Sequence, residues 1–317
     1  MLELHSSNRK GGEPHPVHQK GGYRMQRILN FGCGAIAYNA QYIAAGGNKI
    51  GLVNRISNEM CGTLAGKKNI TALRMNDGYV YAKTTAGIYS MFDLETQQLQ
   101  GTGYCREKKN SSHDGKFYVA TKGILLDILS FKDGQYYFMQ YDFISQKYEK
   151  VCVAKSNFTC KDWLVDDQER KAYILFLEKC CLNHSKTNCY ISVVAIDTLQ
   201  IQAEKSIAFE HGVVPIGLIN THSVLLNTMQ IYDMDTSEKT ALDSNTDFQN
   251  TDYGYFVRMR LAENSHLILI FSKRVLVFDL TTNKLCQSCA YQYGHDAIYL
   301  DGKTYIATWD GFFLADE

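Results

Sequence analysis

The densest group of potential metal ligands lies in one short segment of the sequence. Cys180, Cys181, His184 and Cys189 stand close together there. Thiolate and imidazole groups bind zinc, and a closed tetrahedral site needs four of them within reach. Neighbouring cysteines seldom both bind one ion, however, and this spacing fits no standard zinc-finger pattern. We expect a polar loop between two strands and assign no metal and no cofactor; an adaptor stabilised by a metal at these residues is the alternative.

Cys286 and Cys289 have the spacing that is found in redox and zinc motifs. We expect this segment to be an outer strand, and residues three apart on a strand point to opposite sides of the sheet. The two thiols are therefore not expected to act together.

Two adjacent pairs, His113-Asp114 and His295-Asp296, contain groups that could exchange protons. Neighbours on a strand point apart, and both pairs stand near turn signals, so we expect solvated side chains rather than acid–base couples. The sequence also lacks the Gly-x-Ser-x-Gly elbow, the phosphate-binding Gly-x-x-x-x-Gly-Lys-Ser/Thr loop and the His-Glu-x-x-His motif. It therefore favours a protein that is not an enzyme.

The charge balance limits the class of partner. Lys and Arg together number 33, as do Asp and Glu, so the net charge is zero. Nucleic-acid modules normally have a basic excess, and we interpret the basic runs at 66–68 and 106–109 as solvated loops. No apolar stretch reaches the roughly 18 residues of a membrane helix. With ten cysteines and no secretory signal, we expect reduced thiols and a cytoplasmic protein, with a nuclear location left open.

The elements that must position these residues are strands. The chain has 24 Gly, 21 Tyr and 15 Phe but only 3 Pro. β-Branched and aromatic residues form short runs that end in Asp-Gly, Gly-Gly or Asn-Lys turns. Long helical periodicity is absent from the sequence, which predicts an all-β fold.

A pattern of a short apolar run, an Asp or Asn and a polar turn recurs along the chain. Its acidic or amide anchors are Asn54, Asp93, Asp142, Asp197, Asp235, Asp279 and Asp316. Their mean spacing, (316 − 54)/6 or about 44 residues, matches the period of a four-stranded propeller blade. A second theme, Asp-Gly followed by a strand and a tight Gly turn, occurs at 77–88, 114–124 and 301–312. Seven anchors predict a seven-bladed β-propeller, with a six-bladed or open ring as the alternative.

The ring needs closing, because an unpaired sheet edge invites aggregation. The last anchor, Asp316, precedes the final residue, so the seventh blade lacks its outermost strand. We predict that Gln26–Phe31 supplies this strand and pairs in the C-terminal blade. Residues 1–24 are then a flexible N-terminal tail, and residues 25–317 form a single propeller domain.

The segment from Gly62 to Leu94 resembles a WD40 repeat. Gly66-Lys67 stands where that family has Gly-His, Ile70–Leu73 where it has the inner strand, and Phe92-Asp93 where it has Trp-Asp. Val277-Phe-Asp-Leu280 repeats the strand ending. The resemblance covers roughly residues 26–317 in degenerate form, and it implies a propeller that acts as a protein-interaction scaffold.

In a propeller, the turns between second and third strands lie on one face together with the loops that link the blades. We expect this face to bind a protein or peptide partner, because Trp and Arg are frequent interface hot spots. Its candidate residues are Trp309, Asp310, Arg274, Lys273, Lys122, Lys49 and Arg106. Trp309 could instead pack between blades, and Trp163 is expected in the core. A propeller enzyme or small-ligand binder that uses the central channel is the alternative; a channel lined only by small aliphatic residues would argue against it.

Overall fold

Short β-strands make up nearly all of the regular structure of the chain. In the computed structural model, the described residues are 24–316 without 66–67, 77, 106, 108–115, 155–156, 180–185, 244–245, 247, 249–250 and 263–264. They form seven four-stranded antiparallel sheets and one short helix, η1 (Thr251–Tyr253). Of the predicted tail, only residue 24 is described, and it belongs to a strand.

Each sheet, or blade, is built from consecutive strands. Blade 1 contains β2 (Cys33–Tyr38), β3 (Tyr42–Gly47), β4 (Ile50–Asn54) and β5 (Met60–Leu64). Blade 2 contains β6 (Ile70–Met75), β7 (Tyr79–Thr84), β8 (Ile88–Asp93) and β9 (Leu99–Tyr104). Blade 3 contains β10 (Tyr118–Thr121), β11 (Ile124–Ser130), β12 (Tyr136–Asp142) and β13 (Lys147–Ala154). Blade 4 contains β14 (Phe158–Asp166), β15 (Lys171–Glu178), β16 (Lys186–Ala195) and β17 (Gln200–Glu210).

The remaining blades follow the same order until the last. Blade 5 contains β18 (Pro215–Leu218), β19 (Ser223–Leu226), β20 (Gln230–Asp233) and β21 (Lys239–Ala241). Blade 6 contains β22 (Phe256–Ala262), β23 (His266–Phe271), β24 (Arg274–Asp279) and β25 (Lys284–Ala290). Blade 7 contains β26 (Gly294–Leu300), β27 (Lys303–Thr308), β28 (Phe312–Asp316) and the N-terminal β1 (Arg24–Leu29).

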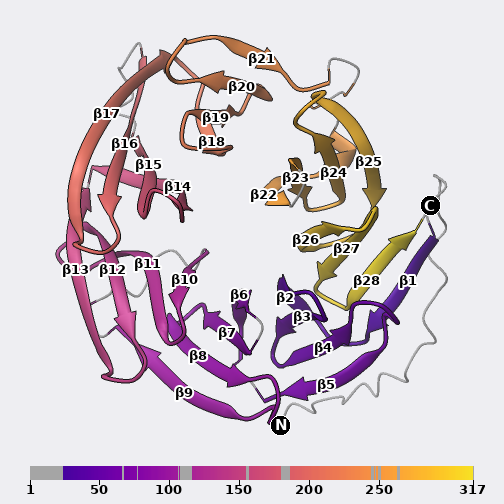
Figure 1. The fold of residues 1–317 in the computed structure, drawn as a ribbon. Coiled ribbons are helices and arrows are strands. Elements are labelled where there is room, and N and C mark those ends of the chain that lie inside the picture. Colours follow the sequence, from indigo (N-terminus) through magenta and orange to yellow (C-terminus); the bar gives the residue numbers. More distant parts are fainter. Residues whose placement is uncertain are drawn as a thin grey trace, which may run out of the picture.

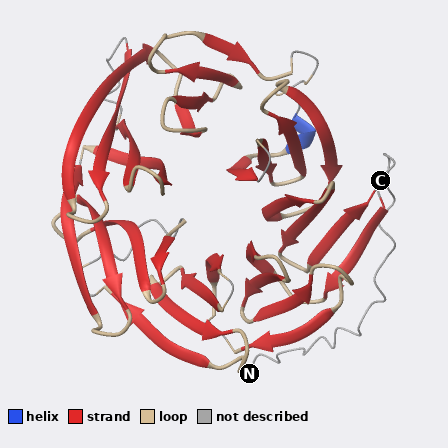
Figure 2. Cartoon of the chain, viewed as in Figure 1, coloured by secondary structure: helices blue, strands red, loops and turns tan. Residues whose placement is uncertain are grey.

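The blades stand side by side in a ring, each with its first strand toward the middle and its fourth at the rim (Figure 1). Strands coloured red account for almost the whole ring (Figure 2). The prediction of an all-β, seven-bladed propeller is confirmed.

Blade 7 is made from both ends of the described chain. β1 pairs antiparallel with β28, with Arg27 opposite Phe313 and Leu29 opposite Phe312. The two strands lie side by side at the rim (Figure 1). The segment predicted for this place, residues 26–31, lies two residues further along the chain than β1 at each end.

The recurring Asp or Asn has a local structural reason. At the end of β8 the carboxylate of Asp93 accepts a hydrogen bond from the Thr96 N–H, and at the end of β24 Asp279 accepts one from Thr281. These bonds close the turn from third to fourth strand, as Asx turns do. They stabilise the charged form, and Asp279, which also accepts from the Thr281 hydroxyl, has its pKa lowered to about 2. In blade 5 the capping residue is Asp233 rather than the predicted anchor Asp235.

The core is divided among the interfaces between neighbouring blades. Between blades 3 and 4, for example, the predicted core residue Trp163 is 5% exposed, and its ring lies 6.1 Å from that of Phe138 in an edge-on contact. Between blades 2 and 3, the Lys83 Nζ lies 2.7 Å from an Asp127 carboxylate oxygen, and both side chains are buried. This carboxylate also accepts a hydrogen bond from the Tyr89 hydroxyl group. Apolar packing and one buried ion pair therefore hold these blades together.

The turns divide between the two faces of the ring. The strands of each blade are antiparallel and follow one another from the centre to the rim. Turns between second and third strands therefore share a face with the blade-linking loops, which we call the link face. Turns between first and second strands, or between third and fourth strands, lie on the opposite face.

The prediction that Lys122 lies on the link face is wrong. Tyr118–Thr121 is the first strand of blade 3, so Lys122 stands between a first and a second strand. The segment 114–124 resembles 77–88 in sequence but is displaced by one strand in the blade. Lys122 consequently lies on the opposite face, where its Nζ stands 4.5 Å from the centre of the Tyr79 ring.

Candidate functional site

The middle of the ring contains a cavity of about 550 Å³, which we call the central cavity. Its wall comes from the innermost strands of several blades, including β2, β6, β14, β18 and β22. Part of the wall is apolar, and part is charged. The charged lining residues are Arg74, Lys116, Lys161, Asp162, Arg258 and Arg260. A chain with zero net charge thus concentrates positive charge at its centre.

One irregularity recurs in every innermost strand. The pairing of the first strand with the second shifts register in all seven blades, as at a β-bulge. The shift lies toward the start of the first strand in six blades and at the end of β10 in blade 3. The residue that follows the shift is Asp162 in β14, Arg258 in β22 and Asp296 in β26. The same position in three blades therefore carries a charge into the centre of the ring.

Asp296 connects three blades. It is completely buried in blade 7, and its carboxylate lies 2.9 Å from Nε of Arg260 in blade 6. The N–H of Ile36 in blade 1 donates to the same carboxylate at 2.8 Å. Arg260 in turn donates from Nη2 to the Ile36 carbonyl at 2.8 Å. The expectation that the His295-Asp296 pair is solvated is wrong for Asp296. The turn signal lies before β26, whereas Asp296 is a residue of β26 and is buried.

Asp162 forms a similar connection on the other side of the ring. One carboxylate oxygen lies 2.5 Å from Nζ of Lys116, and the other accepts the Leu218 N–H at 2.9 Å. This joins blade 4 to blade 5 and to the segment that enters blade 3. At Gly217 a Cβ atom would lie 3.0 Å from Asp162 and 2.2 Å from the Met259 sulfur, so glycine leaves room for both side chains.

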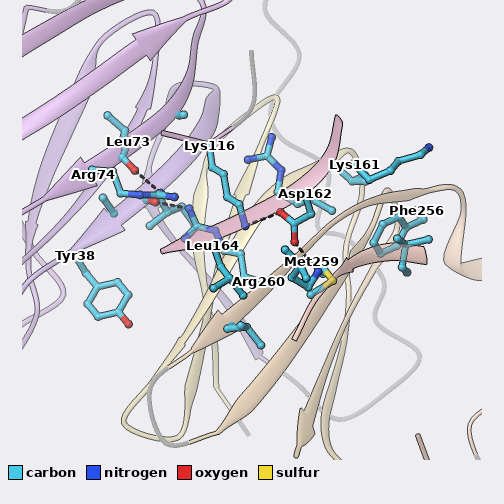
Figure 3. A pocket seen from close by; sticks show the side chains of 18 of the residues that line it. Tyr38, Leu73, Arg74, Lys116, Lys161, Asp162, Leu164, Phe256, Met259 and Arg260 are labelled. Carbon is cyan, nitrogen blue, oxygen red and sulfur yellow. Dashed lines mark hydrogen bonds and ion pairs between the residues drawn. The ribbon is translucent and has the colours of Figure 1, made fainter. Parts of the chain in front are cut away.

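Arg74 is a cation of the central cavity that forms no ion pair with the described residues. Its Nη1 donates to the Leu73 carbonyl at 2.9 Å, and its guanidinium carbon lies 5.9 Å from the centre of the Phe117 ring. Burial and the neighbouring Arg260 guanidinium lower the pKa of Arg74 to about 10, although Asp296 acts in the opposite direction. Figure 3 shows Arg74, Lys116 and Arg260 around one space, with Lys161 extending away from them.

The central cavity therefore combines guanidinium and ammonium groups with apolar walls. Such groups bind phosphate or carboxylate, and arginine does so through two parallel hydrogen bonds. A lining of small aliphatic residues alone would argue against a ligand in the channel. The observed lining also contains charged residues. Among the described residues, no group of three or more His, Cys, Asp or Glu side chains could hold a metal ion.

The residues predicted for the partner face gather mainly around blades 6 and 7. Trp309 lies in the turn between β27 and β28 and is 69% exposed. Its N–H donates to the Tyr293 carbonyl at 3.4 Å, and Tyr293 and Tyr255 are 65% and 71% exposed. We call Tyr255, Tyr293 and Trp309 the aromatic patch. Sequence reasoning named the tryptophan and missed both tyrosines, which precede β26 and β22.

Charged residues surround the aromatic patch. Asp310 pairs with Arg27 at 3.3 Å, and both side chains are exposed. Lys273 is exposed in the turn between β23 and β24. Lys49 lies on the link face of blade 1, with its Nζ 4.4 Å from the centre of the Phe31 ring. Next to that ring, Gly32 packs so closely that a Cβ atom there would lie 2.3 Å from the Trp309 carbonyl oxygen.

Arg274 is placed differently from its neighbour Lys273. Its side chain is partly buried, with Nη1 donating to Ser288 at 2.9 Å and the guanidinium carbon 5.1 Å from the centre of the Tyr253 ring. It therefore helps to fix the turn under the aromatic patch. Arg106 lies outside the described residues.

The cysteine predictions have mixed outcomes. Cys180, Cys181 and His184 lie outside the described residues. Cys189 is buried in β16, where burial raises its pKa to about 12. Cys286 is exposed and Cys289 buried, in agreement with the prediction that the two point to opposite sides of a strand.

His295 is near both the aromatic patch and the central cavity, since its neighbours include Trp309 and Arg258. Its ring meets Trp309 edge-on at 4.6 Å, and its Nε2 is buried and without a hydrogen-bond partner in the described chain. Burial, helped by Arg258, lowers the pKa of His295 from its usual value near 6.5. Because its pKa is lowered, the His295 imidazole is neutral at neutral pH, and it packs against Trp309 in this form.

The comparisons with known proteins concern the fold. No protein-family model matches the chain, and none of the curated proteins matches it by sequence. The β-propeller domain of Cps50 (Swd1) from Myceliophteria thermophila is similar over 93% of this chain and 99% of that one, with a TM-score of 0.64 and 9% identity. The computationally designed Ika8 protein is similar over 91% of this chain and 98% of its own, with a TM-score of 0.59 and 11% identity. The fold is thus that of a seven-bladed β-propeller. The described part of the chain has no helix with the length and hydropathy to span a membrane.

Proposed function

We propose that this protein is a non-catalytic interaction scaffold, and that its link face binds an acidic peptide segment with an apolar side chain as anchor. The observation that carries this proposal is the aromatic patch. Three large aromatic side chains, each more than 60% exposed, stand on link-face segments of two neighbouring blades, and backbone hydrogen bonds connect these segments. Exposed aromatic clusters on a folded surface are typical of protein interaction sites.

The patch is held in place before any partner arrives. The Ser272 N–H donates to the Tyr255 carbonyl at 2.9 Å, and the Gly294 N–H donates to the Ser272 carbonyl at 3.0 Å. Together with the bond between Trp309 and Tyr293, these bonds tie four segments of blades 6 and 7 to one another, namely those before β22 and β26 and the turns β23–β24 and β27–β28. A preformed surface loses little conformational entropy on binding, which favours affinity.

The charges around the patch favour an acidic partner. Lys273 and Lys49 are exposed, whereas the carboxylate of Asp310 is already paired with Arg27. Acidic residues on either side of an apolar anchor would meet these lysines while the anchor contacts the aromatic rings. Such charge complementarity speeds association and selects the partner.

A peptide-binding experiment tests the proposal. Fluorescent peptides with one Leu or Phe between acidic residues would be titrated with the full chain, and affinity measured by anisotropy. We expect Trp309→Ala to weaken binding by about 30-fold, the effect of losing a hot-spot side chain of about 2 kcal/mol. Trp309→Phe should retain part of the affinity.

Ile56→Ala is the matched control, because Ile56 is 91% exposed in a turn on the opposite face. This variant should bind as the wild type does. Binding that Trp309→Ala leaves unchanged, or that Ile56→Ala reduces equally, would remove the aromatic patch from consideration. Preference for basic over acidic peptides would refute the assigned partner chemistry.

A cytoplasmic location belongs to the same proposal. It is supported by free thiols such as those of Cys33, Cys61 and Cys189, which fit a reducing compartment. Other proteins of the cytoplasm or nucleus are then the partners to search for.

A further inference from the structure

The central cavity holds more positive charge than its carboxylates neutralise. Asp162 is engaged by Lys116 and by the Leu218 N–H, and Asp296 is engaged by Arg260 and by backbone N–H groups. Nη1 of Arg258 lies 4.0 Å from the buried carboxylate of Asp296, at the outer limit of an ion pair. Among the described residues, and leaving aside Lys161, which extends away in Figure 3, four cations of the wall face two carboxylates, Asp162 in the wall and the buried Asp296 beside Arg260, an excess of two positive charges.

Part of this excess positive charge can be assigned to Arg74. Within the described chain it forms no ion pair, and its single hydrogen bond goes to a carbonyl of the adjacent residue. The guanidinium groups of Arg260 and Arg258 lower its pKa, and the Asp296 carboxylate acts in the opposite direction. Neighbouring cations in a partly enclosed cavity repel one another, and a bound anion would relieve this repulsion.

We propose that the central cavity is a binding site for a small phosphorylated organic molecule, whose phosphate contacts Arg74 and Arg258. One phosphate dianion supplies the two missing negative charges, and its oxygens match the paired N–H groups of guanidinium. The site is distinct from the aromatic patch, so each of the two proposals can fail without the other.

The rest of the cavity fits the organic part of such a ligand. About 550 Å³ exceeds the space that one phosphate needs and lies in the range of roughly 300–1,000 Å³ that is typical of small-molecule sites. Leu164, Ile216 and Met259 line the same space and offer it apolar contacts. The walls come from innermost strands that a ring of blades holds rigidly, so the site exists before the ligand binds.

Phenyl phosphate is a suitable probe, because it joins a dianionic phosphate to a small apolar ring. Binding to the full chain would be measured by calorimetry at fixed ionic strength, with benzenesulfonate as a monoanion of similar shape. We expect phenyl phosphate to bind and benzenesulfonate to bind at least about tenfold more weakly, because one negative charge leaves the excess half neutralised. Equal binding of both probes, or no binding of phenyl phosphate at millimolar concentration, would overturn the proposal.

Variants of Arg74 separate a binding role from a structural one. Arg74→Met should lose at least about tenfold in affinity for phenyl phosphate, while the melting temperature without ligand stays the same or rises, because a repelled cation is gone. Arg74→Lys keeps the charge without the paired N–H groups, and should bind with intermediate affinity. The control Lys303→Met removes an exposed cation outside the cavity and should bind as the wild type does.

Unchanged affinity in both Arg74 variants would refute the assignment of this residue. If Arg74→Met does not fold, Arg74→Lys decides alone, and wild-type affinity in that variant contradicts the paired contact. Binding of an acidic peptide that depends on Arg74, without binding of phenyl phosphate, would assign the cavity to a peptide and overturn the proposal.

Discussion

The buried carboxylate of Asp296 offers the sharpest test of what holds the ring together. It joins blade 7, in which the first and last strands of the described chain pair, to the neighbouring blades 6 and 1. Asp296→Asn keeps the shape of the side chain and removes its charge. The amide NH2 would replace one carboxylate oxygen and face groups that are donors themselves, either the Ile36 N–H or the Arg260 Nε–H and the Ala297 N–H.

The size of the effect follows from these contacts. Asparagine retains one acceptor oxygen, so at least one charge-assisted hydrogen bond is lost, at about 1.5–3 kcal/mol each. The Arg260 guanidinium is also left without its counter-charge in a largely buried place. Breaking a buried ion pair by removing one partner typically costs about 3–5 kcal/mol. We therefore expect the free energy of unfolding to fall by about 3–5 kcal/mol.

Urea denaturation, followed by tryptophan fluorescence, measures this change. Asp301→Asn is the matched control, because Asp301 also pairs with an arginine, Arg55, but its side chain is 69% exposed. An exposed pair of this kind contributes less than about 1 kcal/mol. If Asp296→Asn and Asp301→Asn destabilise the protein equally, the buried network does not stabilise the ring and the reasoning fails. Combining Asp296→Asn with Arg260→Met should recover part of the loss, because the unpaired charge is then removed.

Three further outcomes follow from the structure. Gly32→Ala should destabilise by about 1–3 kcal/mol in thermal unfolding, since its Cβ would overlap a carbonyl oxygen of blade 7, whereas Gly78→Ala, with nothing within 4 Å, should be neutral; equal effects would contradict the close packing. Under native conditions iodoacetamide should modify exposed Cys286 well before buried Cys189, whose thiol has a pKa raised by burial to about 12, and mass spectrometry showing the reverse order would refute this burial pattern. The pKa of His295 is lowered in the folded protein, so on acidification the unfolded chain takes up the proton first. Stability is therefore retained above about pH 6.5 and falls as the pH drops toward the folded-state pKa. His295→Gln should flatten this fall in denaturation midpoints measured from pH 7.5 to 5, and an unchanged slope would exclude His295 as its source.

The fold could be predicted because its signals are local. Asp93 and Asp279 cap turns through hydrogen bonds within three residues, so the turn chemistry repeats in the sequence at the period of a blade. Segment 114–124 misled the assignment of Lys122 because a first and a second strand can share the same local pattern. Only pairing with distant strands distinguishes them.

The charged centre could not be predicted in the same way. Arg74 and Asp296 are separated by more than 200 residues, and neither has a recognisable motif around it. A weak signal was present in Arg258-Met-Arg260, since charged residues at alternating positions of an otherwise apolar strand need a reason to be there. Their convergence depends on the closing of the ring, which no single segment encodes.

The pairing of β1 with β28 also determines how the molecule would respond to force. Arg24 is opposite Asp316 and Leu29 is opposite Phe312. The first residue of β1 and the last residue of β28 therefore lie side by side at one end of the strand pair. A load applied through residues 24 and 316 would break the backbone hydrogen bonds one after another, as a zipper opens, instead of shearing them together. The propeller should therefore open at low force along this one seam, while the other six blades, each made from one continuous stretch of chain, still resist.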